Sequence, residues 1–266
     1  MISSLKKLLF YAIEPLDLLI RRLNGKKDYP PIYLRRRVGP LKDFEAISRE
    51  FFIYLKLWCN LKPESKILDV GCGCGNLARQ FSSFINGEGS YHGIDVDRSA
   101  IKWAHENIGY KKNIIHFSRL NTRNAYYNPK GTEIAGDLPF PFKDSSFDII
   151  IFKSVFTHIL APECKYYISE IARLLQPAGK CLATFFLFDD EPSLEDGINP
   201  NFKYGEGVCR YRDEHLPEAV TAFKKSFILD LLEQNGLSLS HPIFPGTWSQ
   251  LSAGLSHQDI IILEKK

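Results

Sequence analysis

The sequence lacks any extreme of composition that would assign it to a special class of protein. Its 266 residues carry a formal net charge of only +3, with 44% apolar and 24% charged residues. These values are ordinary for a globular chain, so disordered and fibrous classes are excluded. The net charge gives no argument for nucleic acid binding. The length suits one large α/β domain with extensions, because single cores rarely grow beyond about 250–300 residues.

Cysteine pairs with the spacing of a zinc or redox site are also missing. The six cysteines include no CxxC pair, and a bridge between Cys72 and Cys74 would be strained. A chain of this length does not need disulfides, so we expect reduced thiols, a cytoplasmic protein and no metal site. Acidic residues cluster over residues 189–196. They could bind a metal, but a solvated loop is the preferred interpretation.

No run of about 20 uninterrupted apolar residues occurs, so we expect no membrane-spanning helix. Residues 5–23 nevertheless carry apolar side chains at helical spacing with basic flanks, and residues 1–45 together carry a charge of +5. Such a helix could make a peripheral contact with a membrane surface. The alternative is a packing face for the main domain or a second subunit.

The rest of the chain predicts an alternating series of strands and helices. A charged, turn-rich linker, "NGKKDYPPIYLRRRVGP", precedes a helix from about Asp43 to Cys59. The predicted strands are "KILDV", "SYHGIDV", "NIIHF", "FDIIIF", "GKCLATFFLF", "LSLSHPIF" and "HQDIIILEK". The later predicted helices are "RSAIKWAHENI", "CKYYISEIARLLQ" and "PEAVTAFKKSFILDLLEQNG". Alternation of this kind predicts an α/β fold with a parallel sheet covered on both faces, and the last two strands predict an edge hairpin.

We therefore divide the chain into residues 1–42, a basic amphipathic helix with its linker, and residues 43–266, the main domain. Within that domain, residues 189–216 lack a regular pattern and are aromatic-rich. Long irregular segments are often lids or binding loops. We expect this one to cover a substrate through Tyr204, Tyr211 and His215. The alternative is a disordered surface excursion. The insert "NAYYNPKGTEIAGD" would form the opposite wall.

A glycine loop, "DVGCGCGNLA", follows the first strand of the main domain. Glycines there allow tight turns and close approach of a ligand. The dinucleotide fingerprint G-x-G-x-x-G fails, because Asn76 stands at its third glycine position. Asp69 ends the preceding strand, where its carboxylate would repel a phosphate and attract a cation. S-adenosylmethionine carries a sulfonium and an ammonium group and no phosphate, so the charge favours this methyl donor.

The second strand ends at Asp95 in "GIDVD". A carboxylate about 20 residues beyond the loop can accept hydrogen bonds from both ribose hydroxyls. The alternative role is helix N-cap, for which Asp97 and Ser99 are better placed.

Four segments in this order resemble the successive motifs of class I S-adenosylmethionine-dependent methyltransferases. They are most similar to the branch that methylates small molecules, lipids and glycans. The segments are "ILDVGCGCGNLA", "YHGIDVDRSAI", "LPFPFKDSSFDIIIFKSVFTHI" and "EIARLLQPAGKCLATFF". The resemblance covers about Phe44–Phe188, and "HQDIIILEK" matches the usual last strand. It implies a three-layer, Rossmann-like fold whose seven-stranded, mostly parallel sheet has the order 3-2-1-4-5-7-6, with strand 7 antiparallel.

The resemblance also implies which residues hold S-adenosylmethionine. By the family pattern, the methionine part lies against Asp69 and the glycine loop, and the ribose lies against Asp95. The cofactor-binding set is Asp69, Gly71, Cys72, Gly73, Gly75, Asp95, Val96, Asn121 and Lys153. Asn121 stands where the family usually has an acid for the adenine amino group, and its amide oxygen can still accept that hydrogen bond. Asp137 is an alternative, and Leu138 and Phe140 could line the adenine pocket or be core.

Methyl transfer needs a base only when the nucleophile must lose a proton, as a hydroxyl must. His158, in "SVFTHI" after the fourth strand of the main domain, is the candidate catalytic base because imidazole titrates near neutrality. The alternative is a histidine that fixes the loop through a backbone hydrogen bond. Lys153, at the strand end, could also orient an anionic acceptor or lie in solvent.

We expect an enzyme that methylates a small-molecule, sugar or lipid acceptor, most readily at a hydroxyl group. The sequence lacks the "NPPY" and Pro-Cys segments of nucleobase methylation, so no DNA partner is expected. One alternative is a non-catalytic cofactor-binding or interaction protein. Another is an RNA methyltransferase that grips phosphates with Arg35, Arg36 and Arg37, which would need a continuous basic face.

Overall fold

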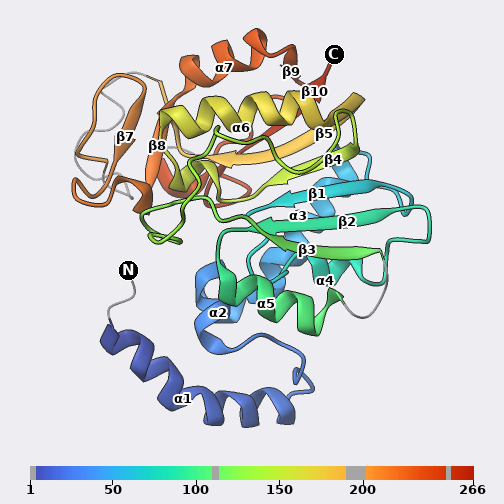
Figure 1. The fold of residues 1–266 in the computed structure, drawn as a ribbon, viewed down its shortest axis with the longest axis vertical. Coiled ribbons are helices and arrows are strands. Elements are labelled where there is room, and N and C mark those ends of the chain that lie inside the picture. The colour runs from blue at the N-terminus through green and yellow to red at the C-terminus, as the bar shows by residue number, and fades with distance from the viewer. Residues whose placement is uncertain (1–3, 110–113, 190–201, 250–252) are drawn as a thin grey trace.

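The computed structural model describes residues 4–109, 114–189, 202–249 and 253–266. Its centre is a twisted seven-stranded sheet with helices on both faces (Figure 1). The strands are β1 (Lys66–Val70), β2 (Ser90–Asp95), β3 (Ile115–Arg119), β4 (Phe147–Phe152), β5 (Leu175–Phe185), β9 (Leu237–Leu239) and β10 (Asp259–Lys265). They lie in the order β3-β2-β1-β4-β5-β10-β9, and β10 is antiparallel to both of its neighbours. Numbered along the chain, this is the order 3-2-1-4-5-7-6, which confirms the expected fold class.

Two hydrophobic layers sandwich the sheet, one on each face. Side chains alternate along a strand, so in β4 Ile150 and Phe152 join one layer and Ile149 and Ile151 join the other. The first layer is covered by α6 (Ala161–Leu174) and α7 (Lys225–Gln234). The second is covered by α3 (Phe44–Trp58), the short α4 (Ala78–Phe81) and α5 (Arg98–Asn107). The near-continuous apolar runs of the central strands follow from this burial on both faces.

A second, three-stranded sheet lies beyond β5 and corrects one expectation. It consists of β6 (Leu187–Phe188), β8 (Thr221–Lys224) and β7 (Cys209–Tyr211), in the order β6-β8-β7. The segment from residue 217 to 236 was expected to be one helix. Instead, a 3-10 turn at Pro217–Ala219 leads into β8, and α7 begins only at Lys225. Thr221 and Phe223, a β-branched and an aromatic residue, are fully buried between two strands, which favours extended backbone over helix.

The N-terminal region holds two helices rather than one helix and a linker. Besides α1 (Ser4–Leu23), the helix α2 (Ile32–Val38) lies within the segment that was expected to be turn-rich. Pro31 precedes it, and the Pro31 carbonyl accepts hydrogen bonds from the N–H groups of Leu34 and Arg35. Proline is well suited to a helix start. The two prolines that suggested an irregular linker therefore lie just before the first residue of α2.

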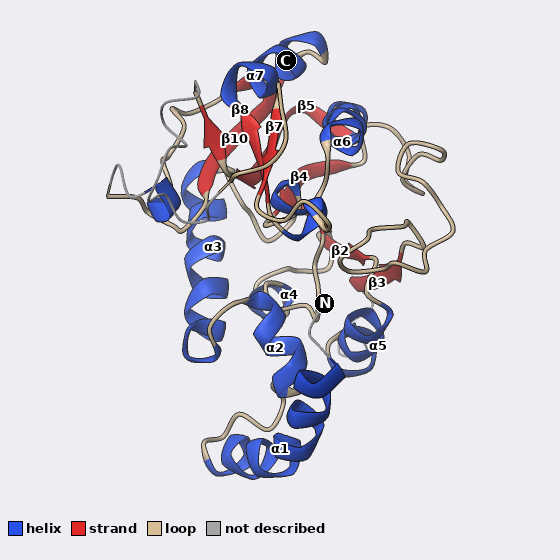
Figure 2. Ribbon diagram, turned by 90° about the vertical axis from the view of Figure 1, so that its left-hand side faces the viewer, coloured by secondary structure: helices blue, strands red, loops and turns tan. Residues whose placement is uncertain are grey.

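An ion pair joins α1 to α2. Arg21 pairs with Glu14 and Asp17, and Asp17 also pairs with Arg35. Leu34 turns inward against Phe44 and the loop after β1. Figures 1 and 2 show α1 at one end of the molecule, separated from the sheet by α2. In the part of the chain that the structure describes, no helix is long and apolar enough to cross a membrane.

Candidate functional site

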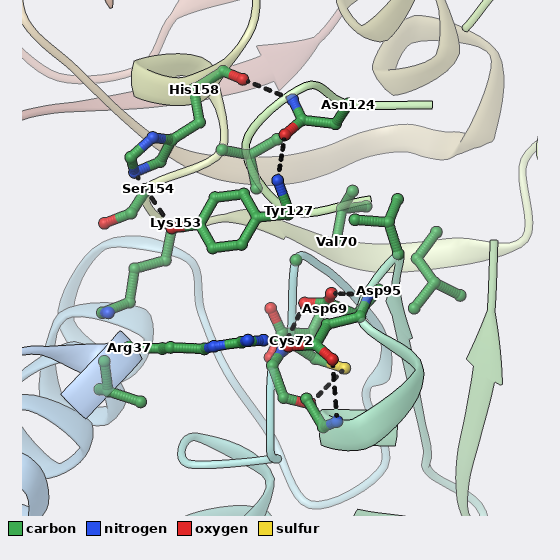
Figure 3. Close-up of a pocket in the computed structure, with 18 of the residues that line it drawn as sticks. Arg37, Asp69, Val70, Cys72, Asp95, Asn124, Tyr127, Lys153, Ser154 and His158 are labelled. Carbon is green, nitrogen blue, oxygen red and sulfur yellow. Dashed lines mark hydrogen bonds and ion pairs between the residues drawn. The ribbon is translucent and has the colours of Figure 1, made fainter. Parts of the chain in front are cut away.

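A cavity of about 350 Å³ lies at the carboxyl ends of β1, β2 and β4 (Figure 3). Open α/β sheets bind ligands at this edge, near the point where the strand order reverses. Here the chain leaves β1 toward β2 on one side, while β4 is its neighbour on the other. The loops after these strands line the cavity, and α2 and α3 contribute further residues.

The glycine loop after β1 forms one wall because its backbone takes conformations that other residues resist. Gly71, Gly73 and Gly75 have φ angles of +75°, +56° and +72°. A Cβ on Gly71 would lie 2.5 Å from a methyl group of Val155, and a Cβ on Gly75 would lie 2.8 Å from Ile108. A Cβ on Gly73 would meet open space. Gly71, Cys72 and Gly73 line the cavity, whereas Gly75 is not among the lining residues and its Cα faces Ile108 and Phe117.

Two carboxylates lie beside this loop. Asp69 is buried and accepts a hydrogen bond of 2.5 Å from the Tyr91 hydroxyl. Burial raises the pKa of Asp69 to about 7, although the Tyr91 hydrogen bond and nearby Lys153 act to lower it. Asp95 accepts hydrogen bonds from the N–H groups of Gly73 (2.8 Å) and Asp97 (2.7 Å). Burial also raises the pKa of Asp95, to about 6. Bringing a cation into the cavity would offset the cost of ionising both groups.

The residues present fit S-adenosylmethionine. Two desolvated carboxylates suit a positively charged nucleoside without phosphate, and Gly73 leaves room for a ligand against the backbone. Asp97 caps α5 instead, because its side chain accepts hydrogen bonds from the N–H groups of Ser99 and Ala100. Asp97 therefore caps the helix, as expected, and Asp95, Val96 and Asp97 all line the cavity.

Lys153 also lines the cavity, so it does not merely lie in solvent at the strand end. Its ammonium group lies over the ring of Phe51 from α3, 5.2 Å from the ring centre. Burial lowers the pKa of Lys153, while the charge of Asp69 acts to raise it. The lysine therefore adds a basic group to a lining that holds carboxylates and also the guanidinium groups of Arg36, Arg37 and Arg123.

His158 lies in a short 3-10 turn after β4 and lines the cavity (Figure 3). Its Nδ1 is 3.1 Å from the carbonyl oxygen of Glu218, and its Nε2 is 3.4 Å from the Tyr127 hydroxyl. A carbonyl oxygen can only accept, so Nδ1 carries the hydrogen and Nε2 keeps its lone pair. Burial lowers the pKa of His158, which keeps the ring neutral. The imidazole is therefore a proton acceptor whose Nε2 faces the Tyr127 hydroxyl.

Asn124 and Glu218 hold the segment that presents Tyr127. The Asn124 side chain donates to the His158 carbonyl (2.9 Å) and accepts from the N–H of Tyr127 (2.8 Å). Glu218 accepts a hydrogen bond of 2.6 Å from the N–H of Ala125. The beginning of the insert "NAYYNPKGTEIAGD" thus forms a wall of the cavity, and the turn before β8 fastens it.

Arg37 is a cavity residue that sequence reasoning assigned elsewhere. It extends from α2 toward the glycine loop and pairs with Asp97 at the start of α5 (Figure 3). Arg35 hydrogen bonds to the Pro30 carbonyl and pairs with Asp17. Two of the three consecutive arginines are thus engaged within the protein, and Arg36 is the exposed one. In the sequence, only "LRRRV" bears on this position. If the segment is taken as a helix, Arg37 lies three residues after the buried Leu34 and therefore on the same inward side.

The expected adenine contacts lie outside the cavity lining. The Asn121 side-chain oxygen accepts from Arg119 (3.0 Å), and its amide donates to Thr132 (2.7 Å). The flanking residues Leu120 and Thr122 line the cavity instead. Asp137 and Leu138 are exposed, and Phe140 packs in the core. The position after β3 therefore adjoins the cavity, while the role of Asn121 stays a prediction.

The expected acceptor contacts also lie apart from the cavity. Tyr204 and Tyr211 pair through their backbones, and their rings stack with centres 6.4 Å apart. His215 is exposed. None of the three lines the cavity, and their role in acceptor binding stays a prediction. Residues 190–201, which include most of the acidic cluster and much of the expected lid, lie outside the described residues.

Comparison with known proteins identifies the central segment. Residues 68–183 match the family model described as "Methyltransferase domain". The chain is 30% identical over 131 residues to the ubiquinone/menaquinone biosynthesis C-methyltransferase UbiE of Wigglesworthia glossinidia brevipalpis. The aligned residues make up 49% of this chain and 46% of the relative. It is 28% identical over 193 residues to a sterol 24-C-methyltransferase of Schizosaccharomyces pombe, and this alignment covers 70% of this chain and 45% of the relative. The chain thus spans less than half the length of these two curated relatives.

Among solved structures, the PH0226 protein from Pyrococcus horikoshii has a similar fold. The two chains superpose with a TM-score of 0.55 at 18% identity, over 84% of this chain and 92% of the other. At this level of identity the likeness concerns the fold alone.

Proposed function

We propose that this chain, which contains a class I S-adenosylmethionine-dependent methyltransferase domain, transfers a methyl group to a hydroxyl group of a small-molecule, sugar or lipid acceptor. One observation carries the choice of a hydroxyl. A neutral His158 lines the cavity with its Nδ1 engaged by a backbone carbonyl and its Nε2 facing the Tyr127 hydroxyl.

The chain's own residues would divide the work between binding and proton transfer. S-adenosylmethionine supplies an activated methyl group on a positively charged sulfur. Asp69 and the glycine loop would hold its methionine part, and Asp95 would accept hydrogen bonds from the ribose hydroxyls. Alignment of the two reactants supplies much of such a rate enhancement, about 7–11 kcal/mol at best. The rigid loop and the buried carboxylates suit that role.

Proton removal would fall to His158. The Tyr127 hydroxyl lies 3.4 Å from Nε2, so an acceptor hydroxyl that hydrogen bonds to the Tyr127 oxygen would pass its proton to Tyr127 while Tyr127 passes its own to the imidazole. The Glu218 carbonyl fixes the tautomer that this step needs and would stabilise the resulting imidazolium, because the Nδ1 hydrogen is already donated to it. Lys153 would orient an anionic part of the acceptor.

The alternative to a hydroxyl oxygen as the methylated atom is carbon, because the names of the two curated relatives describe C-methyltransferases. The engagement of Arg35 and Arg37 within the protein speaks against the RNA alternative, which needed all three arginines to grip phosphates. The other alternative is a non-catalytic cofactor-binding or interaction protein. Such a protein would need the carboxylates but no base, so the neutral His158 in the same cavity favours an enzyme.

Transfer of a labelled methyl group tests the proposal. Hydroxyl-bearing lipids, sugars and phenols would be offered with labelled S-adenosylmethionine, and the methylated atom would be identified by mass spectrometry. We expect His158→Gln to lower kcat by about 10²–10⁴-fold, the usual contribution of a general base, at unchanged cofactor affinity. The matched control is His116→Gln, an exposed histidine of β3 outside the cavity. Methylation at carbon, or a wild-type rate in His158→Gln, would contradict the proposal.

A further inference from the structure

The outward surface of α1 is apolar and has no cover. Half of the large apolar side chains that are strongly exposed in the described part of the chain lie on this one helix. They are Leu9, Tyr11, Leu16, Leu19, Ile20 and Leu23, each between 49% and 78% exposed. At 100° per residue, five of these positions fall within about 100° of arc on one side of the helix. Tyr11 lies outside that arc, and its ring centre is 5.7 Å from that of Tyr33 in α2. An apolar surface of this kind marks a place of contact with another apolar phase.

The acidic side chains of α1 face the opposite way. Glu14 and Asp17 are largely buried, and both pair with Arg21, while Asp17 also pairs with Arg35 of α2. Glu14 additionally accepts a hydrogen bond of 2.9 Å from the N–H of Ile32 at the start of α2. The negative charge of α1 is thus used to hold α2. From residue 9 to residue 23, no acidic side chain remains on the exposed surface.

Basic side chains adjoin the apolar surface. Arg22 is exposed on α1, and Lys27 is exposed just after it. Cations beside an uncovered apolar stripe match the interface of a bilayer that contains anionic lipid, where apolar groups enter the acyl boundary and cations meet head groups. A second copy of the chain fits less well, because it would bring further cations and no acid to the same surface.

We propose that α1 docks the protein on anionic lipid bilayers, with Leu9, Leu16, Leu19 and Leu23 inserted at the interface and Arg22 and Lys27 against the head groups. This docking does not depend on the proposed function. α1 lies at one end of the molecule, so a flat surface can reach it (Figures 1 and 2). Because α2 both packs on α1 and lines the cavity, docking would hold the cavity one helix away from the lipid.

Vesicle co-sedimentation of the full chain tests this docking. The probes are vesicles of phosphatidylcholine alone and vesicles that also contain phosphatidylglycerol, each at low and high ionic strength. We expect binding to the anionic vesicles at low salt, much weaker binding to the neutral ones, and release from the anionic vesicles at high salt. Arg22→Gln with Lys27→Gln should weaken binding to the anionic vesicles.

Leu16→Ser with Leu19→Ser is the decisive variant. Both leucines are exposed, so the fold should be kept, which circular dichroism and the unfolding temperature would verify. Each inserted leucine contributes roughly tenfold in partitioning, so the pair should lose about 100-fold in affinity for anionic vesicles. The matched control is Ile53→Ser with Leu57→Ser, two exposed apolar residues on α3, which should bind as wild type.

Four results would overturn the proposal. Wild type could remain in the supernatant with anionic vesicles, bind both kinds of vesicle equally, or bind as well after the two α1 leucines are replaced. Sedimentation analysis could also show a wild-type dimer that the α1 variant converts to monomer, which would make a second copy the true occupant of this surface. None of these measurements involves methyl transfer, so they are independent of the proposed function.

Discussion

At the residue scale, the buried carboxylate of Asp69 links ligand binding to pH. Burial raises its pKa to about 7, whereas in an unfolded chain it would ionise near the ordinary value of 3.8. The folded state therefore holds a proton that the unfolded state has lost. The stability gained from this group is complete below about pH 4 and is lost as the pH rises through about 7.

We therefore expect the free energy of unfolding of the ligand-free wild type to fall, relative to Asp69→Asn, between about pH 4 and pH 7. The asparagine keeps an acceptor for the Tyr91 hydroxyl and does not titrate. Urea titrations of both proteins across this range measure the difference. In parallel, affinity for S-adenosylmethionine should rise with pH in wild type, because the cation prefers the ionised carboxylate. A parallel pH dependence in the two proteins would show that Asp69 keeps an ordinary pKa.

The proposed role of Asp95 in cofactor binding must be separated experimentally from its role in holding the glycine loop. Its oxygens accept hydrogen bonds from the N–H groups of Gly73 and Asp97, so replacement by alanine would also loosen the loop. Asp95→Asn keeps the shape and one acceptor. A lost hydrogen bond to a charged group costs about 1.5–3 kcal/mol. We expect cofactor affinity to fall about 10- to 100-fold, as measured by calorimetry. The exposed carboxylate of Asp230 supplies the control, Asp230→Asn. An unchanged dissociation constant would remove Asp95 from the binding site.

Residues next to a strand end could be placed from the sequence, and residues brought in from elsewhere could not. Asp69 and Asp95 lie at the ends of their strands, and Lys153 and His158 lie within six residues after β4, so the strand positions put them at the same edge. Glu218 reaches the cavity from a turn sixty residues beyond His158. The local sequence, "LPEAV", contains no pattern that predicts a contact with the site. Such contacts depend on how distant elements pack, which a single sequence does not show.

At the scale of elements, the strands and helices with a strong apolar period were predicted well, and short elements in polar or proline-rich segments were missed. β8 has only four residues, and the helical pattern after it obscured its start. α2 has seven residues with three arginines. Its stability comes from packing rather than from its own propensity, because isolated helices of this length are marginal.

That packing gives a test of α2 as a structural wall. Leu34 is 1% exposed and contacts Phe44, Cys74 and Ala100, residues of α3, the glycine loop and α5. We expect Leu34→Ala to lower the free energy of unfolding by about 2–5 kcal/mol, the range for a buried leucine. Leu57→Ala on the exposed side of α3 should change it by less than about 0.5 kcal/mol. Urea denaturation measures both, and equal small effects would show that residues 32–38 behave as a loose linker.

At the scale of the whole molecule, alternation of strands and helices in the sequence predicted a parallel sheet, but not its order. The order followed from the resemblance of the motifs to a known family, and the structure confirms it. The second sheet and the helix pair at the N-terminus lie outside those motifs. They are therefore the parts that sequence reasoning described least well, although α2 lines the cavity and the turn before β8 contributes Glu218 to it.

The identity of the ligand can be tested on the intact protein through its stability. A ligand that binds only the folded state at about one hundred times its dissociation constant adds about 2.7 kcal/mol to the free energy of unfolding. For a domain of this size, about 2–4 °C per kcal/mol is typical, so S-adenosylhomocysteine should raise the unfolding temperature by roughly 5–10 °C. NAD⁺ should leave it unchanged, because Asp69 and Asp95 face the cavity and Asn76 replaces the third glycine of the dinucleotide fingerprint. A shift with NAD⁺ and none with S-adenosylhomocysteine would contradict this assignment. A pyrophosphate would then lie beside two buried carboxylates, so these would not select a cation without phosphate.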